Sequence, residues 1–242
     1  MSFLSSFTLK NKKSLVSVDL HSHLIPFIDD GVKDLKQSIK LISHLENMNY
    51  KKLIISPHIS DMFPNSSIII RKGFNSLKEE LLNRNIKIEI EIAAEYYADE
   101  SFELLLKKGD ILSFGKEKYL LFELSYFTLP IDLESLIYDI KLAGYTPVLA
   151  HPERYSYFHG SLKKYQDLKK MGVLFQINLV SISNYYSSKI TKIVKELILN
   201  GMVDFIGSDT HHQAHTKALE EVLSSSLYLK IFKYNTILND TL

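Results

Sequence analysis

Short apolar runs rich in β-branched residues alternate with amphipathic segments along most of this 242-residue chain. The apolar runs are candidate strands, and they lie at residues 15–20, 52–56, 86–94, 119–124, 146–150, 173–178 and 203–207. Candidate helices lie at residues 33–49, 66–84, 100–108, 131–143, 161–171 and 187–200, with another from about residue 216. Strands joined by helical crossovers run parallel, because each helix carries the chain back to the start of the next strand. The sequence therefore predicts an α/β fold with a mainly parallel sheet.

Glycines and the spacing of the elements indicate how these units are organised. Gly144, Gly172 and Gly201 each follow a candidate helix and precede a strand, which is typical of glycines at helix C-caps. Seven strands with seven following helices favour a closed barrel over an open sheet. The chain contains no internal repeat and no linker rich in Pro, Gly or Ser. We therefore expect one domain over residues 1–242, with its core at about 15–225.

The composition excludes several classes of protein. The chain has 29 basic and 28 acidic side chains, so it lacks the excess of positive charge that attracts nucleic acids or anionic membranes. It has no cysteine, which excludes disulfides, iron–sulfur clusters and a thiolate nucleophile. No run approaches the ~20 apolar residues of a membrane-spanning helix, and the first lysines follow the short apolar start, the reverse of a secretory signal. We expect a cytoplasmic protein with no membrane insertion and no nucleic-acid partner.

Metal-binding residue types follow six of the seven candidate strands. In a barrel of parallel strands the active site lies at the carboxyl ends, so these side chains are expected on one face. The candidates are His21, His23, His58, Glu95, Glu123, His151, Asp209 and His211. Each one alone has an ordinary explanation, such as a hydrogen-bonded core histidine or a carboxylate paired with an arginine. Their recurrence at the same end of successive strands favours a metal site.

The number and type of these donors indicate which ions they suit. Eight imidazole and carboxylate donors exceed the needs of one ion and suit two or three divalent ions that share carboxylates. Ligands of this kind without sulfur suit Mn, Fe or Zn, and the oxygen-rich positions also suit Mg. We expect manganese first. Such ions lower the pKa of a bound water and neutralise phosphoryl charge, and Arg154 offers a bidentate fork to a phosphate nearby. The alternative for Arg154 is a carboxylate pair that orients its loop.

These residues, in this order, resemble the polymerase-and-histidinol-phosphatase (PHP) superfamily. More narrowly, they resemble its bacterial capsule-associated protein-tyrosine phosphatases. The matching blocks are Asp19-Leu20-His21-Ser22-His23-Leu24-Ile25-Pro26, Ile28-Asp29-Asp30-Gly31, Ser56-Pro57-His58, Ala94-Glu95-Tyr96-Tyr97, His151-Pro152-Glu153-Arg154-Tyr155 and Gly207-Ser208-Asp209-Thr210-His211. They extend from about residue 18 to residue 212, which is most of the chain.

The resemblance implies a single-domain, distorted (β/α)7 TIM-like barrel, the PHP fold, with three metal ions. By position the first ion is held by His21, His23, Glu95 and Asp209, the second by Glu95, Glu123 and His151, and the third by His58, Glu123 and His211. Arg154 matches the phosphate-binding arginine. Enzymes of this kind dephosphorylate the tyrosine-rich tail of a bacterial tyrosine kinase that governs capsule or exopolysaccharide export. The implied activity is that of a protein-tyrosine phosphatase.

The chain departs from the family pattern around the first loop and near its last motif. Phe27 stands where a glycine is usual, and Val32 stands where a proline is usual, which affects loop shape and substrate fit. A second basic residue usual after the last motif has no clear match. His212, His215 and Lys217 are its candidates.

The mechanism we expect is direct hydrolysis of phosphotyrosine by metal-activated water, with no covalent phospho-enzyme. Arg154 and the ions stabilise the equatorial oxygens, and a phenolate with a pKa of ~10 leaves without a strong general acid. Glu153 and Asp209 are candidates for proton transfer.

Three other functions remain open from the sequence. A phosphatase of a small phosphomonoester such as histidinol phosphate uses the same chemistry, and the aromatic candidates to stack on its substrate are Tyr96, Tyr97, Tyr126 and Tyr155. An amidohydrolase is disfavoured because Glu123 stands where that class has a lysine. A catalytically silent barrel that binds a kinase tail is disfavoured by the complete set of donors.

Overall fold

The computed structural model describes residues 12–242, which form parallel β-sheets surrounded by helices. The strands are β1 (Val18–Leu20), β2 (Lys52–Ile55), β3 (His58–Ile59), β4 (Glu89–Ile92), β5 (Glu95–Tyr97), β6 (Tyr119–Glu123), β7 (Thr146–Ala150), β8 (Leu174–Asn178) and β9 (Phe205–Gly207). One sheet has the order β1-β2-β4, and the other has the order β3-β5-β6-β7-β8-β9. Neighbouring strands in both sheets are parallel. The predicted α/β fold with parallel strands is confirmed.

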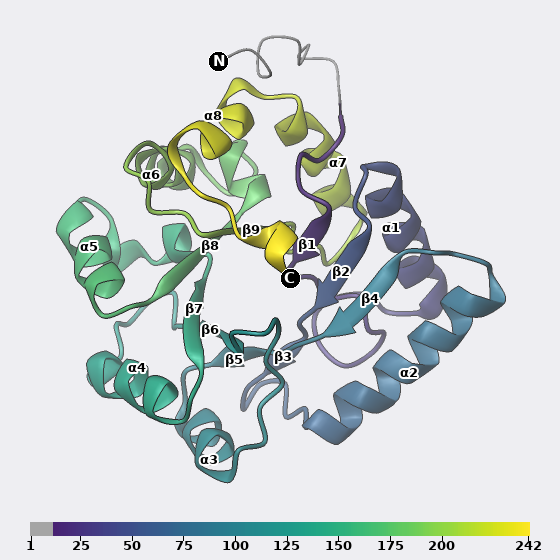
Figure 1. Ribbon diagram of the computed structural model, residues 1–242, viewed down its shortest axis with the longest axis horizontal. Helices are drawn as coiled ribbons and strands as arrows, with labels where there is room; N and C mark the ends of the chain where they lie inside the picture. The colour runs from purple at the N-terminus through teal and green to yellow at the C-terminus, as the bar shows by residue number, and fades with distance from the viewer. Residues whose placement is uncertain (1–11) are drawn as a thin grey trace.

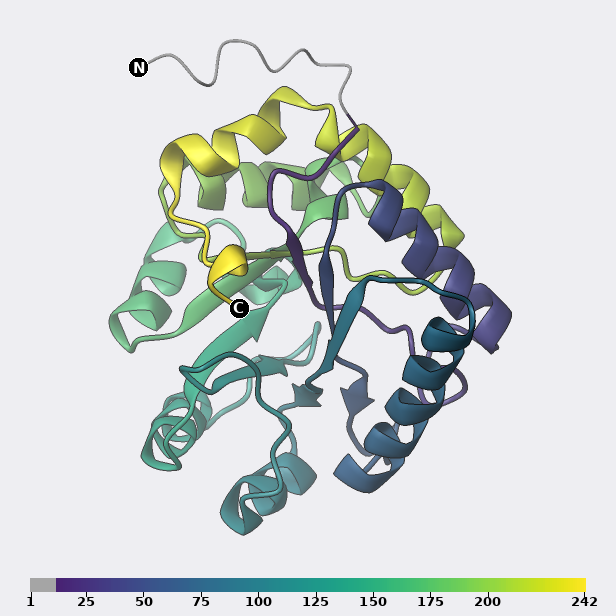
Figure 2. The same ribbon diagram turned by 45° about the vertical axis from the view of Figure 1, so that its right-hand side comes forward.

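Helices follow the strands and enclose them (Figure 1; Figure 2). The α-helices are α1 (Leu35–Asn47), α2 (Ser67–Asn83), α3 (Glu100–Lys108), α4 (Leu133–Leu142), α5 (Leu162–Lys170), α6 (Ser188–Leu199), α7 (Gln213–Leu223) and α8 (Ser226–Tyr234). Short 3-10 helices lie at Pro152–Arg154, Ser156–Phe158, Leu179–Ile182 and Asn239–Thr241. Gly144, Gly172 and Gly201 have positive φ angles directly after the C-caps of α4, α5 and α6.

After two of the candidate strands, 52–56 and 86–94, the chain forms a further short strand beyond a two-residue interruption. β3 follows β2 after Ser56 and Pro57, and β5 follows β4 after Ala93 and Ala94. Proline has no N–H to donate to a ladder, so Pro57 ends the regular pairing of β2. Beyond the interruptions β3 pairs with β5, with His58 opposite Glu95. The interruptions therefore place two candidate ligands side by side at the start of the second sheet.

The two sheets also meet at β1 and β9. A parallel bridge joins Ser22 to Thr210, just beyond the carboxyl ends of these two strands. Toward their amino ends the buried Asn239 side chain accepts a hydrogen bond from Ile206 N–H and donates to the carbonyl oxygens of Val18 and Ile206. Residues after 225 thus contribute to the fold, although the predicted core ends at about that residue.

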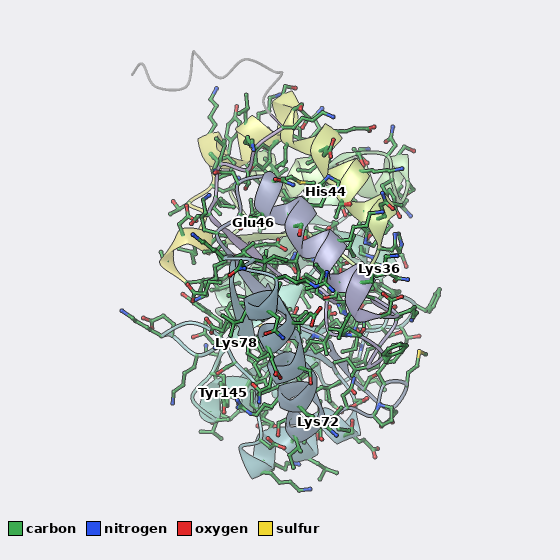
Figure 3. The ribbon with its side chains drawn as sticks, turned by 90° about the vertical axis from the view of Figure 1, so that its right-hand side faces the viewer. Lys36, His44, Glu46, Lys72, Lys78 and Tyr145 are labelled. Carbon is green, nitrogen blue, oxygen red and sulfur yellow. The ribbon has the colours of Figure 1, made fainter. Side chains whose placement is uncertain are left out.

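Apolar side chains form two clusters on opposite sides of the strands. The larger cluster fills the space between strands and helices and includes Leu53 and Phe175. The smaller one lies among the strands and includes Val18, Leu121 and Phe205. The outer sides of α1 and α2 carry charged residues, among them Lys36, Glu46, Lys72 and Lys78 (Figure 3). Within residues 12–242 no helix has the length and apolarity needed to cross a bilayer.

Candidate metal centre

The structure brings all eight candidate donors together beyond the carboxyl ends of the strands. His21, His23 and Glu95 are fully buried, and His151, Asp209 and Glu123 are at most 6% exposed. His58 and His211 are partly buried. Their donor atoms form overlapping groups in which all atoms lie within 4.8 Å of one another: His21, His23 and Glu95; His21, His151 and Asp209; and His58, Glu95 and Glu123. A fourth such group contains His23, Asp30, His58 and His211.

Glu95 lies at the middle of this cluster. Its Oε2 is 3.0 Å from His21 Nε2 and 3.1 Å from His58 Nδ1, and its Oε1 is 2.9 Å from His151 Nε2. The Nε2 atom of His23 is 3.5 Å from the same Oε2. Both carboxylate oxygens of Glu95 therefore face imidazole nitrogens.

Asp209 and Glu123 flank Glu95 on two sides. Asp209 Oδ1 is 3.4 Å from His21 Nε2 and 3.3 Å from His211 Nδ1. Glu123 Oε1 is 3.1 Å from His58 Nδ1. Together these carboxylates give each histidine of the cluster an acidic neighbour.

The charges in the cluster fit it to divalent cations. Burial lowers the pKa of His21, but the charges of Glu95 and Asp209 outweigh burial and raise that pKa to about 9. Burial likewise opposes ionisation of Glu95, yet His21 and His58 hold its pKa well below the usual range. His58 Nδ1 is buried 3.1 Å from two carboxylates without a hydrogen bond to any described residue. Without a metal, the buried carboxylates favour protonated imidazoles. Divalent cations can supply that positive charge in place of the protons.

Three of these donors stand on an unusual backbone. His21, His151 and Asp209 have φ angles of 86°, 35° and 48°, in the left-handed region that residues with a Cβ rarely adopt. Each comes directly after a strand or a short strand extension, where the chain turns into the site. Such strain costs on the order of 1–3 kcal/mol per residue and clusters at functional sites.

Neighbouring polar residues orient the donors. Gln176 and Asn178 lie on β8, the one strand for which the sequence predicts no donor. Gln176 Oε1 accepts a hydrogen bond from His21 Nδ1 at 2.7 Å, and Asn178 Nδ2 donates to Asp209 Oδ2 at 2.6 Å. Gln176 Nε2 also donates to Asn178 Oδ1 at 3.0 Å, so the two form one chain of hydrogen bonds. Asn178 ends β8 and Gln176 lies two residues before it, so polar residues close to a strand end were the one signal for this pair in the sequence.

Asp29 and Asp30 complete the loop side of the site. Asp29 Oδ2 accepts from His23 Nδ1 at 2.8 Å, a contact that leaves Nε2 directed at the cluster. Asp30 Oδ1 lies 3.3 Å from His211 Nε2 and 3.5 Å from His58 Nε2. Both residues belong to the Ile-Asp-Asp-Gly block, from which no role for either was predicted.

A cavity of about 750 Å³ opens above the cluster, and Arg154 lines it. The Arg154 Cζ atom lies 4.4 Å from the centroid of the Tyr126 ring and 4.7 Å from that of Tyr186. Its NH1 is 3.5 Å from Asp209 Oδ2. Of the Lys and Arg side chains in residues 12–242, only Arg154 lines this cavity. The guanidinium is thus held between two rings beside the cluster.

Several candidates from the sequence have other surroundings. Glu153 is fully buried and accepts from the Asn178 N–H, so the structure does not bring it to the cavity. Tyr97 and Tyr126 line the cavity, whereas Tyr96 and Tyr155 are fully buried, each with its hydroxyl bound to backbone.

The three candidates for a second basic residue differ in whether they line the cavity. His212 and His215 line the cavity, and the exposed Lys217 does not. Burial is the main cause that lowers the pKa of His215 to about 4, and its Nδ1 accepts from the His211 N–H at 3.2 Å. His215 is therefore neutral near pH 7 and brings no positive charge to the cavity.

This constellation defines an α/β protein in which side chains that could hold metal ions and one arginine gather beyond the ends of parallel strands. A family model described as "Capsular polysaccharide synthesis, CpsB/CapC" matches residues 17–226. The chain belongs to this family.

Known relatives agree with that assignment. The chain is 27% identical over 196 residues to the tyrosine-protein phosphatase YwqE of Bacillus subtilis, covering 81% of this chain and 77% of that protein. It is 28% identical over 201 residues to the tyrosine-protein phosphatase CpsB of Streptococcus agalactiae, covering 81% and 83%. One of the crystal structures of B. subtilis YwqE and Streptococcus pneumoniae CpsB, described as unique metal-dependent tyrosine phosphatases, superposes with a TM-score of 0.78 at 25% identity. That match covers 93% of this chain and 97% of the other.

Proposed function

We propose that this protein is a metal-dependent protein-tyrosine phosphatase, which hydrolyses the phosphoric monoester of phosphotyrosine. The observation that carries this proposal is the cavity in which Arg154 lies beside a buried cluster of imidazoles and carboxylates. Its relatives are named tyrosine-protein phosphatases, and the chain shares their family.

We assign the metal ligands to the eight donors of the cluster together with Asp30. Two or three divalent ions fit this set, with manganese first and iron, zinc or magnesium as alternatives. When bound, such ions activate a water for attack and neutralise charge on the phosphoryl oxygens. The resemblance predicts which ligands hold which ion, with Glu95 and Glu123 each shared between two ions. The central position of Glu95 in the cluster supports this assignment.

We assign substrate binding to Arg154. Its guanidinium offers two parallel N–H donors to the phosphoryl oxygens, and the rings of Tyr126 and Tyr186 limit its rotation. The two oxygens of Asp209 have different neighbours: Oδ1 faces the histidines, and Oδ2 accepts from Asn178 and lies near Arg154. We therefore assign Asp209 as a ligand that also orients the arginine, and we retain it as the candidate for proton transfer. The phenolate leaving group, with a pKa of ~10, departs without a strong acid.

The natural substrate we propose is the phosphotyrosyl tail of a bacterial tyrosine kinase that regulates capsule or exopolysaccharide synthesis. The family's description in capsular polysaccharide synthesis supports this pathway. Kinases of this kind phosphorylate with ATP, so we expect the reaction in the cytoplasm.

We further propose that the two sheets form one distorted (β/α)7 barrel within a single domain over residues 1–242. If β2 with β3 and β4 with β5 are counted as interrupted strands, the described strands number seven. The Ser22–Thr210 bridge and the apolar cluster among the strands support closure between β1 and β9.

The test is hydrolysis of a phosphotyrosyl peptide by the purified protein, with Mn²⁺ and after chelation. We expect activity that needs the metal. His151→Ala should lose both bound metal and activity, because it removes a buried donor. Arg154→Ala should retain the metal and lose activity by about 10²–10³-fold, the usual effect of removing one oxyanion contact. Lys217→Ala, which alters an exposed lysine outside the cavity, is the matched control and should behave as wild type.

Two results would contradict the proposal. Activity that persists after full chelation would exclude metal-dependent hydrolysis. Faster hydrolysis of histidinol phosphate than of the phosphotyrosyl peptide would instead identify a phosphatase of small phosphomonoesters.

A further inference from the structure

Two large apolar side chains are exposed to solvent at the mouth of the cavity. Met62 is 81% exposed and Phe127 is 90% exposed, and both line the cavity that contains Arg154. They come from different loops: Met62 follows β3, and Phe127 follows β6. Exposed apolar side chains at the edge of a polar site gain free energy when a partner covers them. We call these two residues the mouth pair.

The loop that carries Met62 is anchored on the metal centre. The neighbouring Phe63 ring stacks on the His58 imidazole, with 5.4 Å between ring centroids. Ser60 N–H donates to Phe63 O, and Phe63 N–H donates to Ser60 Oγ, both at 3.1 Å. The Asp61 N–H donates to Asp99 Oδ2 at 3.3 Å. Met62 is therefore exposed on a turn with defined hydrogen bonds.

The loop that carries Phe127 has comparable support. Ser125 Oγ accepts from the N–H groups of Phe127 and Thr128, each at 3.3 Å. The Tyr157 hydroxyl donates to the carbonyl oxygen of Ser125 at 2.8 Å. The adjacent Tyr126 ring lies against Arg154. The segment that orients the arginine therefore also presents Phe127 to solvent.

The kind of ligand that would cover the mouth follows from how the residue types change from the buried part of the cavity to its opening. We call the lining carboxylates and histidines with the partly buried Arg154 the floor, the partly buried Tyr126 the wall, and the exposed Met62 and Phe127 the mouth. The floor suits a phosphoryl group, and the wall suits an aromatic ring. The peptide residues on either side of a bound phosphotyrosine would then reach the mouth. The volume of about 750 Å³ falls within the ~300–1,000 Å³ of pockets that enclose drug-sized ligands, which leaves room for more than one side chain.

We propose that the mouth pair docks the residues next to the phosphotyrosine and selects phosphorylated segments with apolar neighbours. This proposal rests on the proposed function and adds to it a preference among phosphopeptides. The exposed Asp61, beside Met62, favours the same choice because it repels acidic neighbours.

The experiment compares two phosphotyrosyl peptides that differ only in having leucine or serine on both sides of the phosphotyrosine. The Mn²⁺-loaded protein should hydrolyse the leucine peptide with about tenfold higher kcat/KM, which corresponds to about 1.4 kcal/mol. In the double variant Met62→Ser with Phe127→Ser this preference should fall to less than threefold, through a higher KM for the leucine peptide. Each single variant should lose part of it. Ile131→Ser, which alters a 98% exposed residue near Phe127 that does not line the cavity, should retain the full preference.

A small substrate, p-nitrophenyl phosphate, separates docking from damage to the site. If the variants lose activity on it as much as on the leucine peptide, the mouth pair supports the metal centre and does not dock peptides, so the proposal fails. The proposal also fails if the wild-type protein hydrolyses both peptides equally, or if the double variant retains the preference. Failure to hydrolyse any phosphotyrosyl substrate with metal bound would instead refute the proposed function itself, and the docking proposal with it.

Discussion

At the scale of single residues, the site depends on partners that hold each donor in one orientation. The His23–Asp29 pair shows this best, because both side chains are buried and Asp29 Oδ2 lies 2.8 Å from Nδ1. The other Asp29 oxygen accepts from the Gly31 N–H at 2.9 Å, which holds the carboxylate in place. When His23 is neutral, this contact places its proton on Nδ1, and Nε2 then presents a lone pair to the cluster.

Asp29→Asn should weaken Mn²⁺ binding by about 10–100-fold, the usual effect of removing such a partner. The amide keeps the shape of the carboxylate but removes the charge that supports His23 as a ligand. Titration calorimetry on metal-free protein measures the affinity, with the exposed Asp167→Asn as control. Equal affinities in both variants would show that Asp29 does not tune the site.

At the scale of elements, the loop between β1 and α1 shows how this chain replaces two residues that are usual in the family. Phe27 has a φ angle of 65° and its side chain is 76% exposed, so it occupies a backbone region that favours glycine while burying little. Val32 is buried and its N–H donates to the carbonyl oxygen of His23 at 3.3 Å, a bond that proline does not make. The loop therefore combines a strained residue with a hydrogen bond that proline could not make.

Phe27→Gly should raise the free energy of unfolding by about 0.5–1 kcal/mol. Glycine relieves a left-handed conformation that costs roughly 1–2 kcal/mol, less the entropy that glycine loses on folding. Urea denaturation measures the change. Phe27→Ala should bring no gain, since alanine retains the Cβ; equal stabilisation by both variants would assign the effect to the lost aromatic ring.

At the scale of the whole molecule, the first and last described strands, β1 and β9, are joined to each other and to residues near the C-terminus. Asn239 makes hydrogen bonds to the backbone of both strands, and its side chain is fully buried. The same strands carry His21 and Asp209 just beyond their carboxyl ends, where Asp209 N–H donates to His21 O at 2.9 Å. The last residues therefore stabilise the junction on which two proposed ligands depend.

Asn239→Ala should lower the free energy of unfolding by about 2–3 kcal/mol, because it leaves buried backbone groups of Val18 and Ile206 without partners. Asn200→Ala is the matched control: that side chain is exposed and bonds only to its own helix, so the change should stay within about 0.5 kcal/mol. Urea denaturation of both variants decides. A loss in the Asn239 variant no larger than in the control would show that the junction does not need this side chain.

Features that depend on local periodicity could be predicted from the sequence. The strand at 146–150 and the helix at 100–108 have the bounds that their patterns predict, since alternation and amphipathic spacing are properties of neighbouring residues. Contacts between distant residues were harder to predict. β3 and β5 were not expected as separate strands, because two- and three-residue strands are too short for a pattern and depend on each other for pairing.

The α/β class, the parallel strands and the residue types at the strand ends could all be predicted from sequence patterns. The three-dimensional packing was needed to place Asp30 near this set, Gln176 and Asn178 behind it, and Tyr186 against Arg154. The structure also places Glu153, Tyr96 and Tyr155 in the protein interior and not at the cavity, contrary to the roles predicted for them. The physical reason is that a strand pattern says which residues end a strand, whereas the direction of each side chain depends on backbone angles such as the positive φ of His21 and on neighbours far away in the chain.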